Sequence, residues 1–241
     1  MTERIEPKSV EVVFLDAGGV LLNPDWERVS GILARHGIRA TSVQLEQAEQ
    51  IAKREMDDAG VGHATADITE ADGYLGWVVR ATGMGVDRDA LHRAASDFDA
   101  EHASDNLWSV MPADVPGSLE RLRDAGYRMA VISNAEPNLR VRIAGAGIEP
   151  FFEAIVISAE VGSQKPDRAI FEEALGRMAV TADRAIHMGD FYSIDVLGAR
   201  GAGIAPVLLD ASGFSSDRDV IRVSSLMELT ALLKANAGEV G

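Results

Sequence analysis

The sequence contains no cysteine and few basic residues, and each shortage excludes a class of protein. Without cysteine there are no disulfides, no thiolate metal sites and no cysteine nucleophile. Only 23 Lys and Arg stand against 38 Asp and Glu, which gives a formal charge of -15. This balance argues against nucleic-acid or membrane partners, because both need a basic surface. An acidic protein still binds phosphate esters where a metal ion supplies positive charge.

Long hydrophobic runs are also missing. No apolar stretch is long enough to span a bilayer, and the polar residues 1–9 do not have the pattern of a signal peptide. We therefore expect a soluble cytoplasmic protein, either a monomer or a homodimer. The 241 residues are 46% hydrophobic and 25% charged, which suffices for one large domain or a domain with an insertion.

Short apolar runs separated by helical patterns predict the fold class. The runs cover residues 12–15, 128–132, 154–157, 185–188 and 204–209. Helical patterns cover residues 114–126, 138–147, 167–178, 193–200 and 224–235. This alternation predicts an α/β fold with a doubly wound, Rossmann-like parallel sheet.

The stretch between the first two runs has a different pattern, because it shows amphipathic helices and no convincing strand. Four apolar stripes have helical spacing: Trp26, Val29, Ile32 and Leu33; Leu45, Ala48, Ile51 and Ala52; Tyr74, Leu75, Trp77 and Val78; and Leu91, Ala94, Ala95 and Phe98. Thr41 or Ser42 is expected to cap the second helix. We expect residues 1–23 and 110–241 to form the core domain, and residues 24–109 to form an all-helical domain inserted after the first strand.

Polar residues follow four of the predicted strands. In chain order they are Asp16, Ser133 with Asn134, Lys165, and Asp190 with Asp195. Ligands of open α/β sheets bind outside the carboxyl ends of the strands, so these side chains are expected to meet at one edge of the sheet. Each has an ordinary explanation when taken alone, such as a turn, a helix cap or a solvated lysine. Their occurrence at successive strand ends favours a common site.

Phosphoryl transfer is a chemistry that needs such a set. A carboxylate such as that of Asp16 can attack phosphorus and form an aspartyl-phosphate, which divides one hard displacement into two easier ones. Lys165 and the Ser133 hydroxyl would hold phosphoryl oxygens. Asp190 and Asp195 would hold Mg²⁺, a hard cation that prefers oxygen ligands. Crowded carboxylates repel one another, so the cluster itself predicts a metal ion.

This ordered set resembles the haloacid dehalogenase (HAD) superfamily, and in particular its phosphatase-type members with a helical cap. The most specific segments are Lys165-Pro-x-x-x-Ile-Phe and Gly189-Asp190 followed by Asp195. The resemblance covers nearly the whole chain. It implies a Mg²⁺-dependent hydrolase, with a cap domain over the site, that acts on a small phosphate monoester through an aspartyl-phosphate.

The resemblance also implies a role for each matching residue. Asp16 matches the nucleophile, and Ser133, Asn134 and Lys165 match the phosphate-binding positions. The implied metal ligands are Asp16, the backbone carbonyl of Gly18, Asp190 and Asp195. The implied partner is a small phosphorylated metabolite.

Gly18 departs from the usual pattern, because phosphatases of this superfamily carry a second Asp at that position. This Asp protonates the leaving oxygen, and such a group typically contributes about 10²–10⁴-fold in rate. One interpretation keeps phosphatase activity, with the acid supplied by substrate, ordered water, His63 or Glu136. Gly18 would then favour substrates with good leaving groups, such as acyl or anomeric phosphates.

Two other interpretations stay open. The first is a different HAD chemistry, since dehalogenases need no acid there but lack the Mg²⁺ site. A phosphonatase would use a cap lysine as a Schiff base, whereas Lys53, on a polar helix face, is expected to be solvated. The second is a degenerate phosphate-binding member without catalysis. Preservation of the other core positions argues against it.

Overall fold

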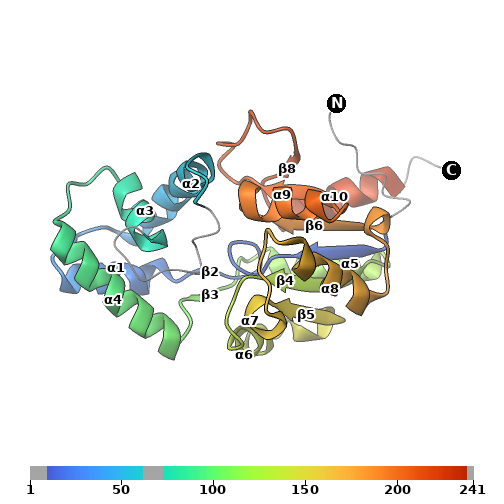
Figure 1. Ribbon diagram of the computed structural model, residues 1–241, viewed down its shortest axis with the longest axis horizontal. Helices are drawn as coiled ribbons and strands as arrows, with labels where there is room; N and C mark the ends of the chain where they lie inside the picture. The colour runs from blue at the N-terminus through green and yellow to red at the C-terminus, as the bar shows by residue number, and fades with distance from the viewer. Residues whose placement is uncertain (1–9, 62–72, 238–241) are drawn as a thin grey trace. The chain divides into compact units, whose positions relative to one another are not determined.

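The computed structural model describes residues 10–61 and 73–237. The chain divides into two compact units, and we consider each by itself. The α/β unit comprises Met1–Asn23 and Met111–Gly241, and the helical unit comprises Pro24–Val110. Figure 1 shows the course of the chain through both, coloured from blue to red. In the two described ranges, no helix is long and apolar enough to cross a membrane.

The α/β unit is built on a six-stranded sheet with the order β5-β4-β1-β6-β7-β8. The strands are β1 Val12–Leu15, β4 Arg128–Ser133, β5 Ala154–Ile157, β6 Ala185–Gly189, β7 Ala205–Leu209 and β8 Ile221–Val223. Every neighbouring pair is parallel. The parallel α/β fold predicted from the alternation is therefore confirmed. The strand β8 was not predicted, because three residues are too few to show a pattern.

Helices connect the strands of this sheet. They are α5 Val115–Asp124, α6 Leu139–Gly145, α7 Ser158–Val161, α8 Arg168–Met178, α9 Leu197–Gly201 and α10 Leu226–Ala237. Two 3₁₀-helices, η2 Glu149–Phe151 and η3 Ala182–Arg184, and a π-helix, η4 Tyr192–Val196, complete the described connections.

One face of the sheet is covered by α8 and α9. Val12 and Phe14 of β1 pack there in a cluster with Ile170 and Phe171 of α8 and Ala199 of α9. Neighbouring residues of a strand point to opposite faces, so the buried Val13 and Leu15 of β1 face the other layer. The central strand is thus enclosed on both faces, which explains its continuous apolar sequence.

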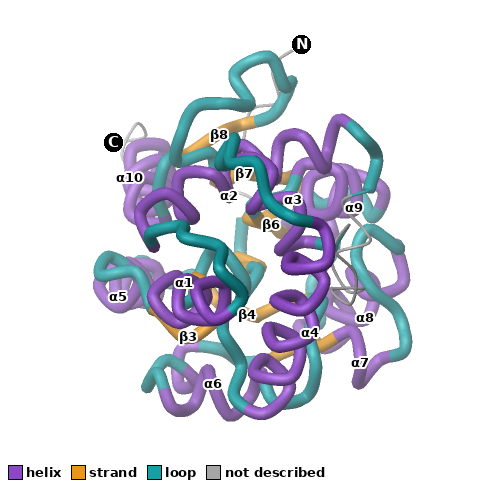
Figure 2. The backbone as a smooth tube through the Cα atoms, turned by 90° about the vertical axis from the view of Figure 1, so that its left-hand side faces the viewer, coloured by secondary structure: helices purple, strands orange, loops and turns teal. Residues whose placement is uncertain are grey.

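The helical unit contains α1 Trp26–Arg35, α2 Ser42–Asp58, α3 Tyr74–Ala81 and α4 Arg88–Ser104. Thr41 caps α2 in a capping box with Gln44. The helix α1 packs against α2 and α4, and α2 packs against α3; Figure 2 labels these helices among the purple segments. A two-stranded sheet pairs β2 Asn23–Pro24 with β3 Trp108–Val110.

Three expectations for the inserted region are wrong. Residues 108–110 form a strand, because the outgoing chain pairs with the incoming one. Ile51 is 37% exposed, although the other aliphatic residues of its stripe are buried. Lys53 is buried rather than solvated, because its Nζ lies 2.8 Å from Glu49 Oε1 one helical turn away. Tyr74 donates a hydrogen bond to the same carboxylate.

Candidate active site

Three predicted site residues lie at the ends of three adjacent strands. Asp16 comes directly after β1, which lies between β4 and β6. Ser133 is the last residue of β4, and Asp190 comes directly after β6. The Asp16 N–H donates to the Met188 carbonyl at 2.9 Å and so extends the pairing of β1 with β6 by one residue. The parallel register therefore places these residues at the same carboxyl edge.

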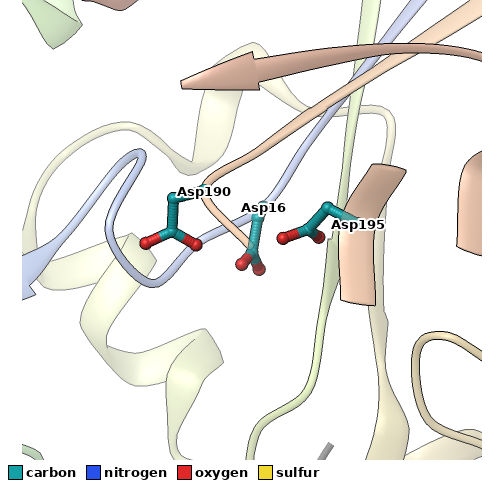
Figure 3. Close-up of side chains that lie close together, drawn as sticks. All are labelled: Asp16, Asp190 and Asp195. Atoms are coloured by element: carbon teal, nitrogen blue, oxygen red, sulfur yellow. The ribbon is translucent and has the colours of Figure 1, made fainter. Parts of the chain in front are cut away.

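The carboxylates of Asp16, Asp190 and Asp195 form a cluster at this edge. One oxygen from each lies within 4.8 Å of the other two. Figure 3 shows the three side chains next to one another, Asp16 from the turn after β1 and Asp190 and Asp195 from the segment after β6. The Asp195 side chain is 1% exposed and that of Asp16 is 13% exposed. Such a set of hard oxygen donors fits a divalent cation such as Mg²⁺.

Lys165 lies inside this cluster. Its side chain is 1% exposed, and Nζ lies 2.6 Å from Asp195 Oδ1 and 3.0 Å from Asp16 Oδ1. Burial alone would lower the pKa of Lys165, but the two carboxylates outweigh it and the net pKa is raised. The lysine is therefore a buried ammonium. Three carboxylates gather around this single ammonium, so a divalent cation would balance the excess of acidic groups.

The two carboxylates beside Lys165 differ in their ease of ionisation. Burial raises the pKa of Asp16, and the attraction to Lys165 only partly opposes this. Burial also acts to raise the pKa of Asp195, but Lys165 and the hydrogen bond from His187 outweigh it, so this pKa lies below its ordinary value. Asp195 is thus the more readily ionised carboxylate of the pair.

Asn134 holds the backbone of Lys165 from both sides. Its Nδ2 donates to the Lys165 carbonyl at 2.8 Å, and the Lys165 N–H donates to Asn134 Oδ1 at 2.7 Å. This pair of bonds ties the segment before α8 to the end of β4. The phosphate contact expected for Asn134 stays a prediction, whereas its contact with Lys165 is present in the structure.

Asp195 is brought to the cluster by a π-helix. The sequence predicted one regular helix over residues 193–200, but the structure has η4 followed by α9. In η4 the side chain of Asp195 turns back toward β6, where its Oδ2 accepts from the Phe191 N–H at 3.0 Å. π-Helical turns are frequently found at functional sites, since they redirect a side chain within a helix.

The turn after Asp16 needs only one of its two glycines for backbone reasons. Gly19 has a φ of 74°, and its N–H donates to the Leu22 carbonyl at 2.9 Å. Gly18 forms an isolated bridge with Leu22 and is not among the residues with positive φ. The handedness of the backbone therefore does not require glycine at position 18. The metal contact expected for its carbonyl stays a prediction.

Of the two candidate acids from the sequence, only Glu136 is among the described residues. His63 lies outside the described residues. Glu136 is exposed in the loop after β4, where its carbonyl accepts from the Leu139 N–H at 3.0 Å. In contrast, sequence reasoning missed His187, which is fully buried on β6 with its Nε2 3.0 Å from Asp195 Oδ1. Its only signal was a polar residue inside an apolar run.

Comparison with known proteins identifies related chains. Residues 10–203 match the family model of haloacid dehalogenase-like hydrolases. A glyceraldehyde 3-phosphate phosphatase of Methanopyrus kandleri is 31% identical over 182 residues, which cover 69% of this chain and 77% of the relative. Another of the same name, from Methanothermobacter thermautotrophicus, is 37% identical over 106 residues, or 44% of this chain and 47% of that relative. This chain thus spans about half the length of the second relative.

A solved structure shows the same fold. The crystal structure of a HAD phosphatase from Thermococcus onnurineus superposes with a TM-score of 0.57 and 20% identity. The match covers 93% of this chain and 98% of that one.

Proposed function

Because this chain belongs to the haloacid dehalogenase-like hydrolase family, we propose that it is a Mg²⁺-dependent phosphatase acting on a small phosphate monoester. One observation carries the proposal: the Asp16 carboxylate follows the central strand with the Lys165 ammonium 3.0 Å away and two further carboxylates beside it. The relatives named as glyceraldehyde 3-phosphate phosphatases support a phosphate-ester substrate.

Asp16 is the proposed nucleophile, and Oδ2 is its attacking atom. Two contacts of this carboxylate use Oδ1, which accepts from the Ala17 N–H at 2.7 Å and lies 3.0 Å from Lys165 Nζ. These contacts engage Oδ1, and in the proposed mechanism Oδ2 is the oxygen that faces the phosphoryl group. In this scheme Oδ2 forms a bond to phosphorus while the ester P–O bond breaks, and the leaving oxygen departs as an anion that takes its proton from solvent water. Water then hydrolyses the acyl phosphate and restores the carboxylate.

Lys165 and Ser133 hold the phosphoryl oxygens in this scheme. Lys165 is already charged and already fixed by Asn134, so little reorganisation is needed when negative charge develops on the phosphoryl group. The Ser133 side chain is buried at the end of β4, one residue before that anchor. A shift of Asn134 would therefore disturb both groups.

The proposed metal ligands are Asp16, Asp190, Asp195 and the Gly18 carbonyl. When bound, the cation would supply positive charge that balances the carboxylates and the phosphoryl group. The absence of a carboxylate at Gly18 favours substrates whose leaving group needs no added proton, such as acyl or anomeric phosphates. The helical unit is the proposed cap domain that selects the leaving group.

The test is phosphate release from a panel of sugar, acyl and nucleotide phosphates, with Mg²⁺ and with chelator. We expect Mg²⁺-dependent release that Asp16→Asn abolishes, since the amide is not a nucleophile, while the circular dichroism spectrum is unchanged. Release of chloride from a 2-chloro acid is the matched assay for dehalogenase chemistry. Chloride release, or no turnover of any phosphate, would contradict the proposal.

A further inference from the structure

His187 is a buried polar residue that the proposed mechanism does not use. Its side chain is 0% exposed on β6. Nε2 lies 3.0 Å from Asp195 Oδ1, and Nδ1 is buried without a hydrogen-bond partner in the described parts of the chain. Asp195 is thus its polar partner within these parts. A buried polar group is costly unless it makes such a bond, so the placement calls for an explanation.

The contact with Asp195 defines which nitrogen of His187 carries the proton. An ionised carboxylate only accepts hydrogen bonds, so Nε2 must be the donor. His187 therefore acts on Asp195 as a hydrogen-bond donor through Nε2.

Packing holds the His187 ring in place. The ring of Phe171 meets it edge-on, with centroids 5.2 Å apart and planes at 86°. Phe171 in turn lies directly over Gly198 of α9, where an added Cβ would be 2.6 Å from the Phe171 ring. The phenylalanine of the Lys165-Pro-x-x-x-Ile-Phe segment therefore has a structural role, because it packs against both His187 and Gly198.

The Asp195 carboxylate is held from three directions. Its Oδ1 accepts from Lys165 Nζ at 2.6 Å and from His187 Nε2 at 3.0 Å, and its Oδ2 accepts from the Phe191 N–H at 3.0 Å. Without His187, Lys165 would be the remaining side chain among these partners and would draw the carboxylate toward itself. The imidazole therefore sets how far Asp195 turns toward Lys165.

We propose that His187 is a positioning residue whose Nε2–H, held in place by Phe171, orients the Asp195 carboxylate for a divalent cation. The inference rests on the proposed function, because that function supplies the cation. Groups that orient metal ligands in this way typically change metal affinity about 10–100-fold when they are removed.

The test measures Mn²⁺ and Mg²⁺ binding by isothermal titration calorimetry on the full chain without substrate. His187→Leu removes the donor and keeps an apolar side chain against Phe171, and we expect the Kd to rise about 10–100-fold. His187→Gln keeps an N–H near the position of Nε2 and is expected to recover most of the affinity. The control is Ile186→Val, a buried change on the opposite face of β6, which should leave the Kd unchanged.

Equal Kd values for the wild type and His187→Leu would overturn the inference. If His187→Leu does not fold, Phe171→Leu tests the same point, because loss of the ring releases the imidazole; an unchanged Kd there would also overturn it. A wild type that binds no Mn²⁺ would overturn both the metal site and this inference. If the wild type binds Mn²⁺ but releases no phosphate, only the proposed phosphatase activity is wrong. The ratio of the Kd of each variant to that of the wild type still decides the role of His187.

Discussion

The carboxylate of Asp195 occupies the space that a side chain at Gly189 would fill. A Cβ built at Gly189 would lie 2.0 Å from Asp195 Cγ and 2.4 Å from Asp195 Oδ2. Gly189 ends β6 and precedes Asp190. A side chain at this one position would therefore affect the placement of both Asp190 and Asp195. The role of Gly189 is to leave room for a carboxylate, since its φ is not in the left-handed region.

Gly189→Ala is therefore expected to displace Asp195 and lose metal-dependent activity. Overpacking of this kind typically costs about 1–3 kcal/mol of the free energy of unfolding. Urea denaturation and calorimetric Mn²⁺ binding measure the two effects. Gly176→Ala is the matched control, because a Cβ there meets nothing within 4 Å in the last turn of α8 and should stabilise the helix. Normal Mn²⁺ affinity in Gly189→Ala would refute the steric explanation.

Asn134→Ala is expected to lower the rate of phosphate release by loosening Lys165. The change removes both bonds to the Lys165 backbone and leaves polar groups without partners, at a cost of about 1–3 kcal/mol. Steady-state kinetics with one acyl phosphate, together with thermal unfolding, give the readout. Asn138→Ala, four residues later and before α6, is the comparison. Equal kcat values for the two variants would show that the hydrogen bonds between Asn134 and the Lys165 backbone do not affect catalysis.

Gly18→Asp should restore a general acid. Because Gly18 does not have a positive φ, a side chain is compatible with the local backbone. Turnover of simple alkyl phosphates is expected to rise, toward the roughly 10²–10⁴-fold that such groups contribute, with a smaller change for acyl phosphates. Gly19→Asp is the control, since its φ of 74° makes a side chain there strained. An equal gain on both substrate classes would argue against the leaving-group explanation for Gly18.

Lys53→Met in the helical unit should be strongly destabilising. It leaves the Glu49 carboxylate buried without the ammonium that lies 2.8 Å away, and breaking such a pair typically costs about 3–5 kcal/mol. The double variant with Glu49→Gln should recover much of the loss, because no unpaired charge remains. Chemical denaturation of the single and double variants gives the coupling energy. Purely additive effects would mean that the pair is not coupled.

Mg²⁺ should raise the thermal stability of the protein, and chelator should reverse the effect. A ligand at 100 times its Kd stabilises the folded state by about 2.7 kcal/mol. Asp190→Asn removes one carboxylate of the cluster and should abolish most of the shift. Differential scanning calorimetry at several Mg²⁺ concentrations is the measurement. A shift of the same size in Asp190→Asn would place the cation elsewhere.

The sheet and the gathering of polar residues at its carboxyl edge were predictable because they depend on local sequence. Buried parallel strands are apolar throughout, and the polar residues directly after them stand out, as at Asp16 and Asp190. The helical stripes were predictable for the same reason, since their spacing is regular. The capping of the second helix by Thr41 also follows from short-range chemistry.

Features that depend on contacts between distant segments could not be predicted. The burial of Lys53 depends on Tyr74 and Glu49 meeting in the folded unit. The anchoring of Lys165 by Asn134 joins residues 31 positions apart. The role of His187 could not be predicted from a sequence pattern, because it is a single polar residue in a buried strand. Its role becomes clear only when the contact with Asp195 is known.

A hydrogen bond joins the two ends of the helical unit, so the unit has the form of an insertion whose ends are adjacent. The Asp25 N–H donates to the Leu107 carbonyl at 2.7 Å, so the chain enters and leaves the unit at nearly the same point. An insertion whose two ends are adjacent can become longer or shorter, or be replaced, without displacing the strands on either side of it. The segment between Asp25 and Leu107 can therefore change in length without displacing the strand ends that carry Asp16 and Ser133.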